Sequence, residues 1–312
     1  MQIQFLGTGA GMPSKERNVT AIALKLLDEI GSIWLFDCGE ATQHQILNTS
    51  IRPRRIDKIF ITHLHGDHIF GLPGFLSSRS FLGGDSALTI FGPAGLQQYV
   101  EAALGVSKTH LTYPVIFVEI DSGVIYEDEN FLVLADKLEH TIECFGYRIL
   151  QKDLPGRLLI EKVQELGVPK GPLYRQLKNG SDVTLDDGTV VRSADVVTLP
   201  QKGFIVTILG DTKYSNSAIK LSENADIVVH EATFNHSTTN LAASYGHSTN
   251  MEAAHVATKA NAKNLIMTHI SARFLKHEVE ALLAESRTIF ANTFVAHDLQ
   301  TFDFKNNRLT EG

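Results

Sequence analysis

The chain has 312 residues, of which 43% are hydrophobic and 20% are charged, and its formal net charge at pH 7 is −7. These proportions are typical of a globular protein and exclude a disordered chain, a collagen-like repeat and a coiled coil. The acidic balance argues against a protein coated with positive charge, so we expect no DNA partner. No apolar stretch of about 18 residues occurs, so no membrane association is expected. The two cysteines suggest a reducing, cytoplasmic location.

The hydrophobic pattern predicts short strands and helices that alternate along two halves of the chain. In the first half we expect one helix at Glu40–Asn48 and several strands within residues 115–150. Five further strands are expected at Gln2–Phe5, Thr20–Leu27, Ile33–Asp37, Lys58–Ile61 and Leu88–Gly92. In the second half we expect four strands and two helices: Phe204–Leu209, Ile227–Val229, Leu265–Met267 and Thr293–Ala296, and Met251–Ala260 and His277–Phe290. This shared rhythm favours a duplicated, layered α/β arrangement.

The segment Gln151–Asp187 interrupts this pattern. It is rich in Gly and Pro and leaves room only for short helices, such as Arg157–Leu166 and Leu173–Lys178. Residues 151–180 hold six basic and three acidic side chains, which reverses the sign of the whole chain. We therefore expect one domain over residues 1–312, with a flexible, basic helical arm inserted at 151–187.

The sequence THLHGDH at 62–68 predicts a metal site. It places His63, His65, Asp67 and His68 within six positions, directly after a predicted strand. Imidazole nitrogens suit zinc, and a carboxylate completes or bridges such a site. His63 and His65 can project to the same side, because side chains alternate along an extended segment.

Three more ligand candidates, His140, Asp211 and His269, stand at the ends of distant predicted strands. Active sites of α/β proteins usually lie at the carboxyl ends of strands. Together the two groups comprise five His and two Asp, the stoichiometry of a hydrolytic site with two zinc ions and one bridging carboxylate.

This ordered ligand set resembles that of the metallo-β-lactamase superfamily. The resemblance implies a four-layered αββα sandwich with a dinuclear zinc site. It further implies that one zinc is held by His63, His65, His140 and Asp211, and the other by Asp67, His68, His269 and the shared Asp211. Members of the superfamily hydrolyse many kinds of ester and amide, so the fold leaves the substrate open.

Three further motifs resemble those of the RNase Z family in its short bacterial form, which are tRNA 3′-processing endonucleases. They are PSKERN at 13–18, the pair HEATF at 230–234 and GHST at 246–249, and the basic arm. The resemblance implies removal of the 3′ trailer from precursor tRNA, leaving a 3′-hydroxyl on the tRNA and a 5′-phosphate on the trailer. It also implies a homodimer in which one tRNA is held by the arm of one subunit and cleaved in the active site of the other.

The resemblance assigns roles to individual residues. Asp67 takes or orients the proton of the attacking water, His247 is the general acid, and Glu231 orients His247. The remaining candidates are expected to bind RNA: Lys15, Arg17 and Asn18 near the cleavage point, and Lys162, Lys170, Arg175 and Lys178 on the arm.

Two other functions fit part of this pattern. A hydrolase of a small ester, thioester or lactone would keep the metal site but would have no use for the basic arm. A non-catalytic RNA-binding protein on the same scaffold would have no need of the complete ligand set.

Overall fold

The structure is a computed structural model that describes all 312 residues. The chain forms two compact units. We call the first, comprising Met1–Glu127, Val133–Ile149 and Ile205–Gly312, the sandwich unit. The second, comprising Asp128–Leu132 and Leu150–Phe204, is the arm unit.

One sheet of the sandwich unit has eight strands in the order β19-β18-β1-β3-β4-β5-β6-β7. From β4 to β7 the neighbouring strands are parallel. The strands are β1 (Gln2–Gly7), β3 (Ala21–Leu26), β4 (Ser32–Phe36), β5 (Ile56–Phe60), β6 (Leu88–Gly92), β7 (Val115–Glu119), β18 (Thr301–Lys305) and β19 (Arg308–Glu311).

The other sheet has seven strands in the order β17-β15-β14-β13-β10-β9-β8, and β13, β14, β15 and β17 are parallel. Its strands are β8 (Gly123–Glu127), β9 (Phe131–Lys137), β10 (Phe145–Gln151), β13 (Ile205–Leu209), β14 (Ile227–Glu231), β15 (Leu265–Thr268) and β17 (Thr293–Val295). Two short strands, β2 (Gly9–Ala10) and β16 (Ile270–Ser271), pair with each other.

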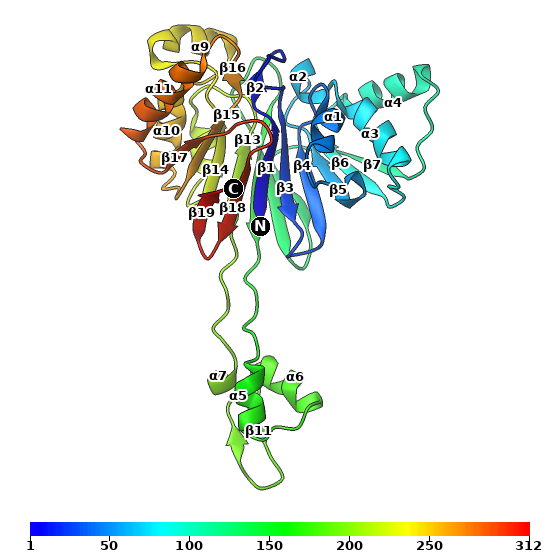
Figure 1. Ribbon diagram of the computed structural model, residues 1–312, viewed down its shortest axis with the longest axis vertical. Helices are drawn as coiled ribbons and strands as arrows, with labels where there is room; N and C mark the ends of the chain where they lie inside the picture. The colour runs from blue at the N-terminus through cyan, green and yellow to red at the C-terminus, as the bar shows by residue number, and fades with distance from the viewer. The chain divides into compact units, whose positions relative to one another are not determined.

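Helices cover the outer faces of the two sheets, as Figure 1 shows for the sandwich unit. On one side lie α1 (Thr42–Leu47), α2 (Gly66–Ile69), α3 (Leu72–Phe81) and α4 (Leu96–Val106), whose apolar side chains share a core with the first sheet. On the other lie α8 (Asn216–Leu221), α10 (Asn250–Lys259) and α11 (Lys276–Arg287) beside the second sheet. A further helix, α9 (Thr239–Tyr245), precedes α10 along the chain. None of the helices is both long and apolar enough to cross a membrane.

Aromatic side chains fill the space between the two sheets. Tyr147 on β10 makes edge contacts with Phe36 on β4 and with Phe60 on β5, at ring-centroid distances of 5.8 and 5.4 Å. All three rings are fully buried. The sheets therefore pack face to face, and the predicted four-layered αββα sandwich is confirmed.

The predicted strands and helices are present, with ends that differ by a few residues from the expected ones. The hairpin of β18 and β19 was missed, although its turn carries a recognisable signal. Asn306 and Asn307 both have positive φ, of 53° and 59°. Asparagine tolerates this conformation well, and it is the one that a tight two-residue hairpin turn requires.

The arm unit is longer than the sequence predicted, because it continues to Phe204 rather than ending at Asp187. It contains the two expected helices, α5 (Ile160–Glu165) and α6 (Pro172–Lys178), and also β11 (Val183–Thr184), β12 (Val190–Val191) and α7 (Ser193–Val196). The later elements belong to it because they complete its own apolar core, formed by Val163, Val168, Leu177, Val183, Val191 and Val196. A small core of this kind needs all of the elements that enclose it.

Candidate metal centre

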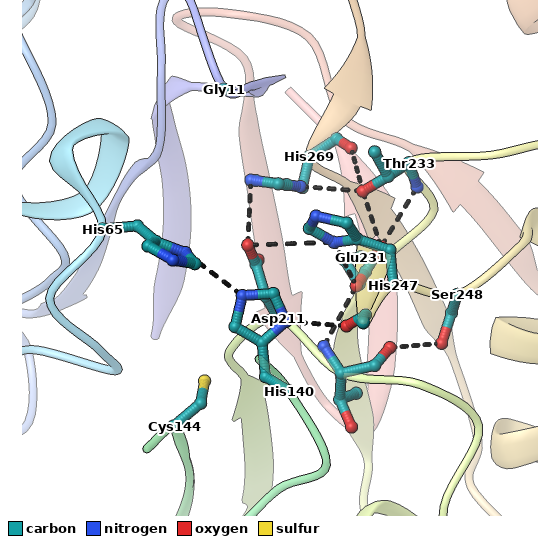
Figure 2. Close-up of polar contacts among 12 residues, drawn as sticks. Gly11, His65, His140, Cys144, Asp211, Glu231, Thr233, His247, Ser248 and His269 are labelled. Carbon is teal, nitrogen blue, oxygen red and sulfur yellow. Dashed lines mark hydrogen bonds and ion pairs between the residues drawn. The ribbon is translucent and has the colours of Figure 1, made fainter. Parts of the chain in front are cut away.

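The predicted ligands converge at the carboxyl ends of strands in both sheets. The segment Thr62–His68, called the ligand loop here although its last three residues lie in α2, follows β5. Asp211 follows β13, and His269 follows β15 directly. His269 has a positive φ of 55°, an uncommon conformation for a non-glycine residue, and it turns the chain sharply at this point. Figure 2 shows His65, His140, Asp211 and His269 pointing toward one another.

His63, His65, His140 and Asp211 form the first group, and one ligand atom of each lies within 4.8 Å of the others. Nδ1 of His65 lies 3.0 Å from Nε2 of His63 and 3.1 Å from Nε2 of His140. Oδ2 of Asp211 lies 3.6 Å from Nε2 of His63. Three imidazoles and one carboxylate thus face a common point.

Asp67, His68 and His269 form the second group, under the same 4.8 Å limit. Nε2 of His269 lies 3.3 Å from Oδ2 of Asp67 and from Nε2 of His68. Oδ2 of Asp211 lies 3.4 Å from Nε2 of both His68 and His269. Asp211 therefore stands between the two groups and lies close to ligand candidates of both.

The chemistry of these donors fits divalent transition-metal ions. Burial lowers the pKa of His63 well below its usual value, which favours the neutral imidazole that binds metal. The pKa of Asp211 lies well below its usual value despite burial, because His269 and His68 favour the charged carboxylate. Imidazole nitrogens and ionised carboxylate oxygens are donors that zinc prefers.

Contacts outside the ligand set fix the orientation of the imidazole rings. Nδ1 of His68 donates to Oδ2 of the buried Asp37 at 2.8 Å, and Nδ1 of His140 donates to the carbonyl of Gly246 at 2.7 Å. In each ring the Nε2 atom is left to face the metal position. Asp37 was not predicted, although it ends the strand predicted at 33–37 in the way that Asp211 follows a strand.

Glu231 is buried and connects three parts of the site. Its Oε1 accepts hydrogen bonds from Nδ1 of His247 at 2.8 Å and from the backbone N–H of Thr212 at 3.0 Å. Its Oε2 accepts from the hydroxyl of Thr233 at 2.6 Å. That hydroxyl in turn lies 2.8 Å from Nδ1 of His269, so Thr233, which was not singled out in the sequence, links Glu231 to a ligand (Figure 2).

His247 lies beside the ligands without belonging to the predicted ligand set. Its Nδ1 is 3.9 Å from Oδ2 of Asp211, and its ring is partly exposed. Burial opposes the charged form, but Glu231 outweighs that effect and raises the pKa of His247 to about 9. At neutral pH this imidazole therefore carries a proton that it can donate.

A pocket of about 340 Å³ opens at the metal centre. Its lining includes Asp67, Asp211, His269 and His247, so both ligand groups and the candidate acid face one open space. A substrate phosphate can thus reach the metal positions and His247 together.

The predicted RNA-binding residues differ in accessibility. Lys15 is exposed. The four residues of the arm that are predicted to bind RNA are also exposed, and none forms an ion pair: Lys162, Lys170, Arg175 and Lys178. Asn18 is half-buried, and its side-chain amide donates to the carbonyl of Glu40 at 2.7 Å.

Arg17, which is expected from the sequence to bind RNA near the cleavage point, is engaged by contacts within the protein. Only 8% of this residue is exposed. Its Nη1 donates to the hydroxyl of Thr8 at 2.6 Å and to the carbonyl of Ala296 at 2.7 Å, and its Nη2 lies 3.3 Å from Nδ1 of His297. Because its donors point into the protein, Arg17 anchors the loop.

Comparison with known proteins places this site in a family. The chain is 56% identical over 303 residues to "Ribonuclease Z" of Bacillus cereus, an alignment that covers 97% of this chain and 99% of that protein. The identity and coverage are the same for "Ribonuclease Z" of Bacillus thuringiensis (strain Al Hakam). A family model described as "Anti-Pycsar protein Apyc1" matches residues 1–109.

Solved structures agree with the sequence comparison. Human tRNase Z, short form (ELAC1), is 29% identical, with a TM-score of 0.70 and coverage of 98% of this chain and 100% of that chain. The metallo-β-lactamase fold protein YhfI from Bacillus subtilis is 20% identical, with a TM-score of 0.65 and coverage of 100% and 99%, and it supports the fold alone. The fold is therefore the metallo-β-lactamase fold, and the chain belongs to the ribonuclease Z family of enzymes.

Proposed function

We propose that this protein is a metal-dependent endoribonuclease that removes the 3′ trailer from precursor tRNA. The cut leaves a 3′-hydroxyl on the tRNA and a 5′-phosphate on the trailer. The observation that carries this proposal is the complete arrangement of seven ligands beside the His247–Glu231 pair, in a chain 56% identical to a ribonuclease Z.

We assign two zinc ions to each subunit. His63, His65, His140 and Asp211 would hold one ion, and Asp67, His68, His269 and the shared Asp211 the other. When bound, the two ions supply a water of lowered pKa and offset negative charge on the phosphoryl oxygens.

The side chains of this site divide the proton transfers between them. The carboxylate of Asp67, held by the backbone N–H of Gly11 at 2.7 Å from Oδ2, orients the attacking water and takes up its proton. The water oxygen bonds to phosphorus as the bond from phosphorus to the 3′-oxygen breaks. Because Nδ1 of His247 is engaged by Glu231, Nε2 of His247 gives a proton to the departing 3′-oxygen.

Two surfaces are proposed to hold the tRNA. Lys162, Lys170, Arg175 and Lys178 of the arm unit contact backbone phosphates, which are read by shape rather than sequence. Lys15 contacts the strand near the cleavage point, while Arg17 and Asn18 act by shaping the loop.

We also propose a homodimer in the cytoplasm. Large apolar side chains are exposed on the helices beside the eight-stranded sheet, namely Leu47 on α1, Phe81 on α3 and Val106 on α4. Burying these side chains against a second subunit would favour association. Cys38 and Cys144 are both free thiols, which suits a reducing compartment.

Cleavage of a precursor tRNA with a 3′ trailer and no encoded CCA, with both ends of the cut mapped, tests this function. We expect one cut after the discriminator nucleotide, lost in chelator and in Asp67→Ala. If the tRNA stays intact while bis(p-nitrophenyl) phosphate or a thioester is hydrolysed, the metal centre belongs instead to a small-molecule hydrolase. Zinc content distinguishes a non-catalytic RNA-binding protein, which has no reason to retain two ions per chain.

A further inference from the structure

An aromatic and cationic cluster lies in the same pocket as the metal ligands and His247. The pocket is lined by Phe234, Tyr245 and Arg273 in addition to the site residues. The rings of Phe234 and Tyr245 are nearly parallel, with centroids 6.3 Å apart and an interplanar angle of 11°. The guanidinium of Arg273 lies over Phe234, with Cζ 4.7 Å from the ring centroid.

The three side chains differ in exposure. Phe234 is buried, with 3% of its surface exposed, whereas Tyr245 is 59% exposed and Arg273 is also exposed. Nε of Arg273 donates to the hydroxyl of Ser271 at 3.0 Å, and no carboxylate pairs with its guanidinium. Phe234 thus backs two accessible planar groups, one aromatic and one cationic.

This combination suits a nucleotide. A base has a π face that stacks on an aromatic ring or on a guanidinium, and its phosphate attracts the charge of arginine. Both groups share a pocket with Asp67 and His269, where the proposed reaction cleaves a phosphodiester.

The position of His247 indicates which nucleotide is bound. Its ring centroid lies 6.0 Å from that of Phe234, so the cluster is on the side of the site that carries the proposed acid. The 3′-oxygen that receives the proton belongs to the nucleotide upstream of the cut. The base of that nucleotide is therefore the one near Tyr245 and Arg273.

We propose that Tyr245 and Arg273, backed by Phe234, form a binding subsite for the discriminator nucleotide and position its 3′-oxygen at His247. This inference rests on the proposed function, since it concerns the same reaction. It assigns Tyr245 to base stacking, and Arg273 to the base or to its neighbouring phosphate.

The test must separate stacking from a structural role, because Tyr245 precedes Gly246, whose carbonyl holds His140. Cleavage by wild type, Tyr245→Ala and Tyr245→Phe is measured on three precursor tRNAs. One is intact, one has an abasic discriminator nucleotide, and one has an abasic first trailer nucleotide. Arg273→Gln is compared with Arg308→Gln, which changes an exposed arginine on β19 outside the pocket. Zinc content and kcat/KM are measured for each variant.

On the intact substrate we expect Tyr245→Ala to lower kcat/KM by about 5- to 150-fold, the range for loss of one stacked base. Tyr245→Phe retains the ring and stays close to wild type. The abasic discriminator lowers the wild-type value to a similar extent and removes the difference between wild type and Tyr245→Ala. The abasic trailer nucleotide leaves that difference in place. Arg273→Gln lowers kcat/KM, whereas Arg308→Gln keeps the wild-type kcat/KM. The zinc content of every variant stays at the wild-type value.

Three results would overturn the inference. One is a Tyr245→Ala defect that persists with the abasic discriminator, and another is a defect cancelled only by the abasic trailer nucleotide. The third is a loss of zinc in Tyr245→Ala, which would show that the ring supports the His140 contact. Failure of wild type to cut the intact substrate would instead refute the proposed function itself, so the two failures are distinguishable.

Discussion

Oδ2 of Asp37 accepts a hydrogen bond from Nδ1 of His68 at 2.8 Å, in a contact between two buried side chains. Oδ1 of the same carboxylate accepts from the backbone N–H of Thr62 at 2.8 Å, and so also holds the first residue of the ligand loop. Asp37 therefore fixes both the tautomer of one ligand and the path of the loop that supplies four of them.

Asp37→Asn is expected to weaken zinc binding by about 10- to 100-fold, the usual cost of removing such a supporting contact. Competition with a chromogenic chelator measures the affinity. Asp57→Asn, which changes a partly exposed carboxylate on β5, is the matched control and is expected to bind zinc as wild type does. Equal affinity of Asp37→Asn and wild type would show that His68 needs no such support.

The pH dependence of cleavage is expected to report the His247–Glu231 pair. Glu231 raises the pKa of His247 to about 9, so the proton is present at neutral pH and is lost as the pH rises through about 9. We expect kcat of the wild type to fall on that alkaline side. In Glu231→Gln the fall moves toward lower pH, because the neutral amide no longer favours the imidazolium.

His247→Ala provides the independent check of that assignment. Loss of a general acid typically lowers kcat by about 10²- to 10⁴-fold, and zinc content is expected to remain unchanged. An alkaline limb that stays in place in Glu231→Gln, or full activity in His247→Ala, would assign the proton transfer to another group.

Removal of the arm unit is expected to abolish cleavage of precursor tRNA while hydrolysis of bis(p-nitrophenyl) phosphate continues. The deletion should replace residues 154–201, because Leu154 and Gln201 pair as a β-bridge and lie close enough for a short linker. A deletion of residues 156–180 would instead leave Val183, Val191 and Val196 without their core partners. Loss of both activities would mean that the arm has a structural role.

Salt dependence tests the same surface without a deletion. Affinity for tRNA is expected to fall as the salt concentration rises. Changing an arm lysine that contacts a phosphate to alanine is expected to make the slope of log affinity against log salt less steep by about 1. Lys162→Ala and Lys170→Ala are the informative variants, and Lys305→Ala on β18 is the control. Unchanged slopes for the arm variants would remove these lysines from the interface.

Arg17 and Lys15 are expected to separate stability from binding. Arg17→Met leaves the hydroxyl of Thr8 and the carbonyl of Ala296 without their donor and is expected to cost about 1–3 kcal/mol of unfolding free energy. Lys15→Ala leaves the urea midpoint unchanged and raises KM for precursor tRNA. Urea denaturation and steady-state kinetics on both variants distinguish the two roles, and a stable Arg17→Met would contradict the anchoring role.

Neither thiol is expected to react with a disulfide reagent in the folded protein. Burial raises the pKa of Cys38 to about 12 and that of Cys144 well above its usual value, so little thiolate exists at mildly alkaline pH. Both residues become reactive when urea unfolds the chain. Rapid labelling of the native protein under the same conditions would show that one of these sites opens to solvent.

Much of the metal centre was predictable from the sequence alone. His63, His65, Asp67 and His68 occupy a compact segment whose spacing is rare outside metal sites, and Asp211 and His269 follow strongly apolar strands. The hydrophobic pattern predicted a duplicated, layered α/β arrangement, because strands and amphipathic helices that alternate along the chain have few ways to bury their apolar faces. The four-layered αββα order was implied by the resemblance of the ligand set to the metallo-β-lactamase superfamily.

The roles of Asp37, Thr233 and Arg17 could not be predicted from the sequence, because they depend on partners far away along the chain. A carboxylate at a strand end and a single hydroxyl carry no distinctive spacing. Asp37 gains its partner only because β4 lies beside the ligand loop, and Thr233 gains His269 only because β14 lies beside β15. The sequence around Arg17 indicates a surface cation. In the folded chain, however, the carbonyl of Ala296 lies 2.7 Å from Nη1 of Arg17 and accepts its hydrogen bond.

The boundary of the arm was set in the same way. Gly and Pro mark its start near residue 151, but its end depends on which later residues share its core, and Val191 and Val196 do so from beyond the predicted limit at 187. The sequence by itself determined the kinds of residue and their order at the metal centre, because ligand chemistry is local. The tertiary structure alone decided which side chains support, anchor or enclose that centre, because those contacts join segments that lie far apart along the chain.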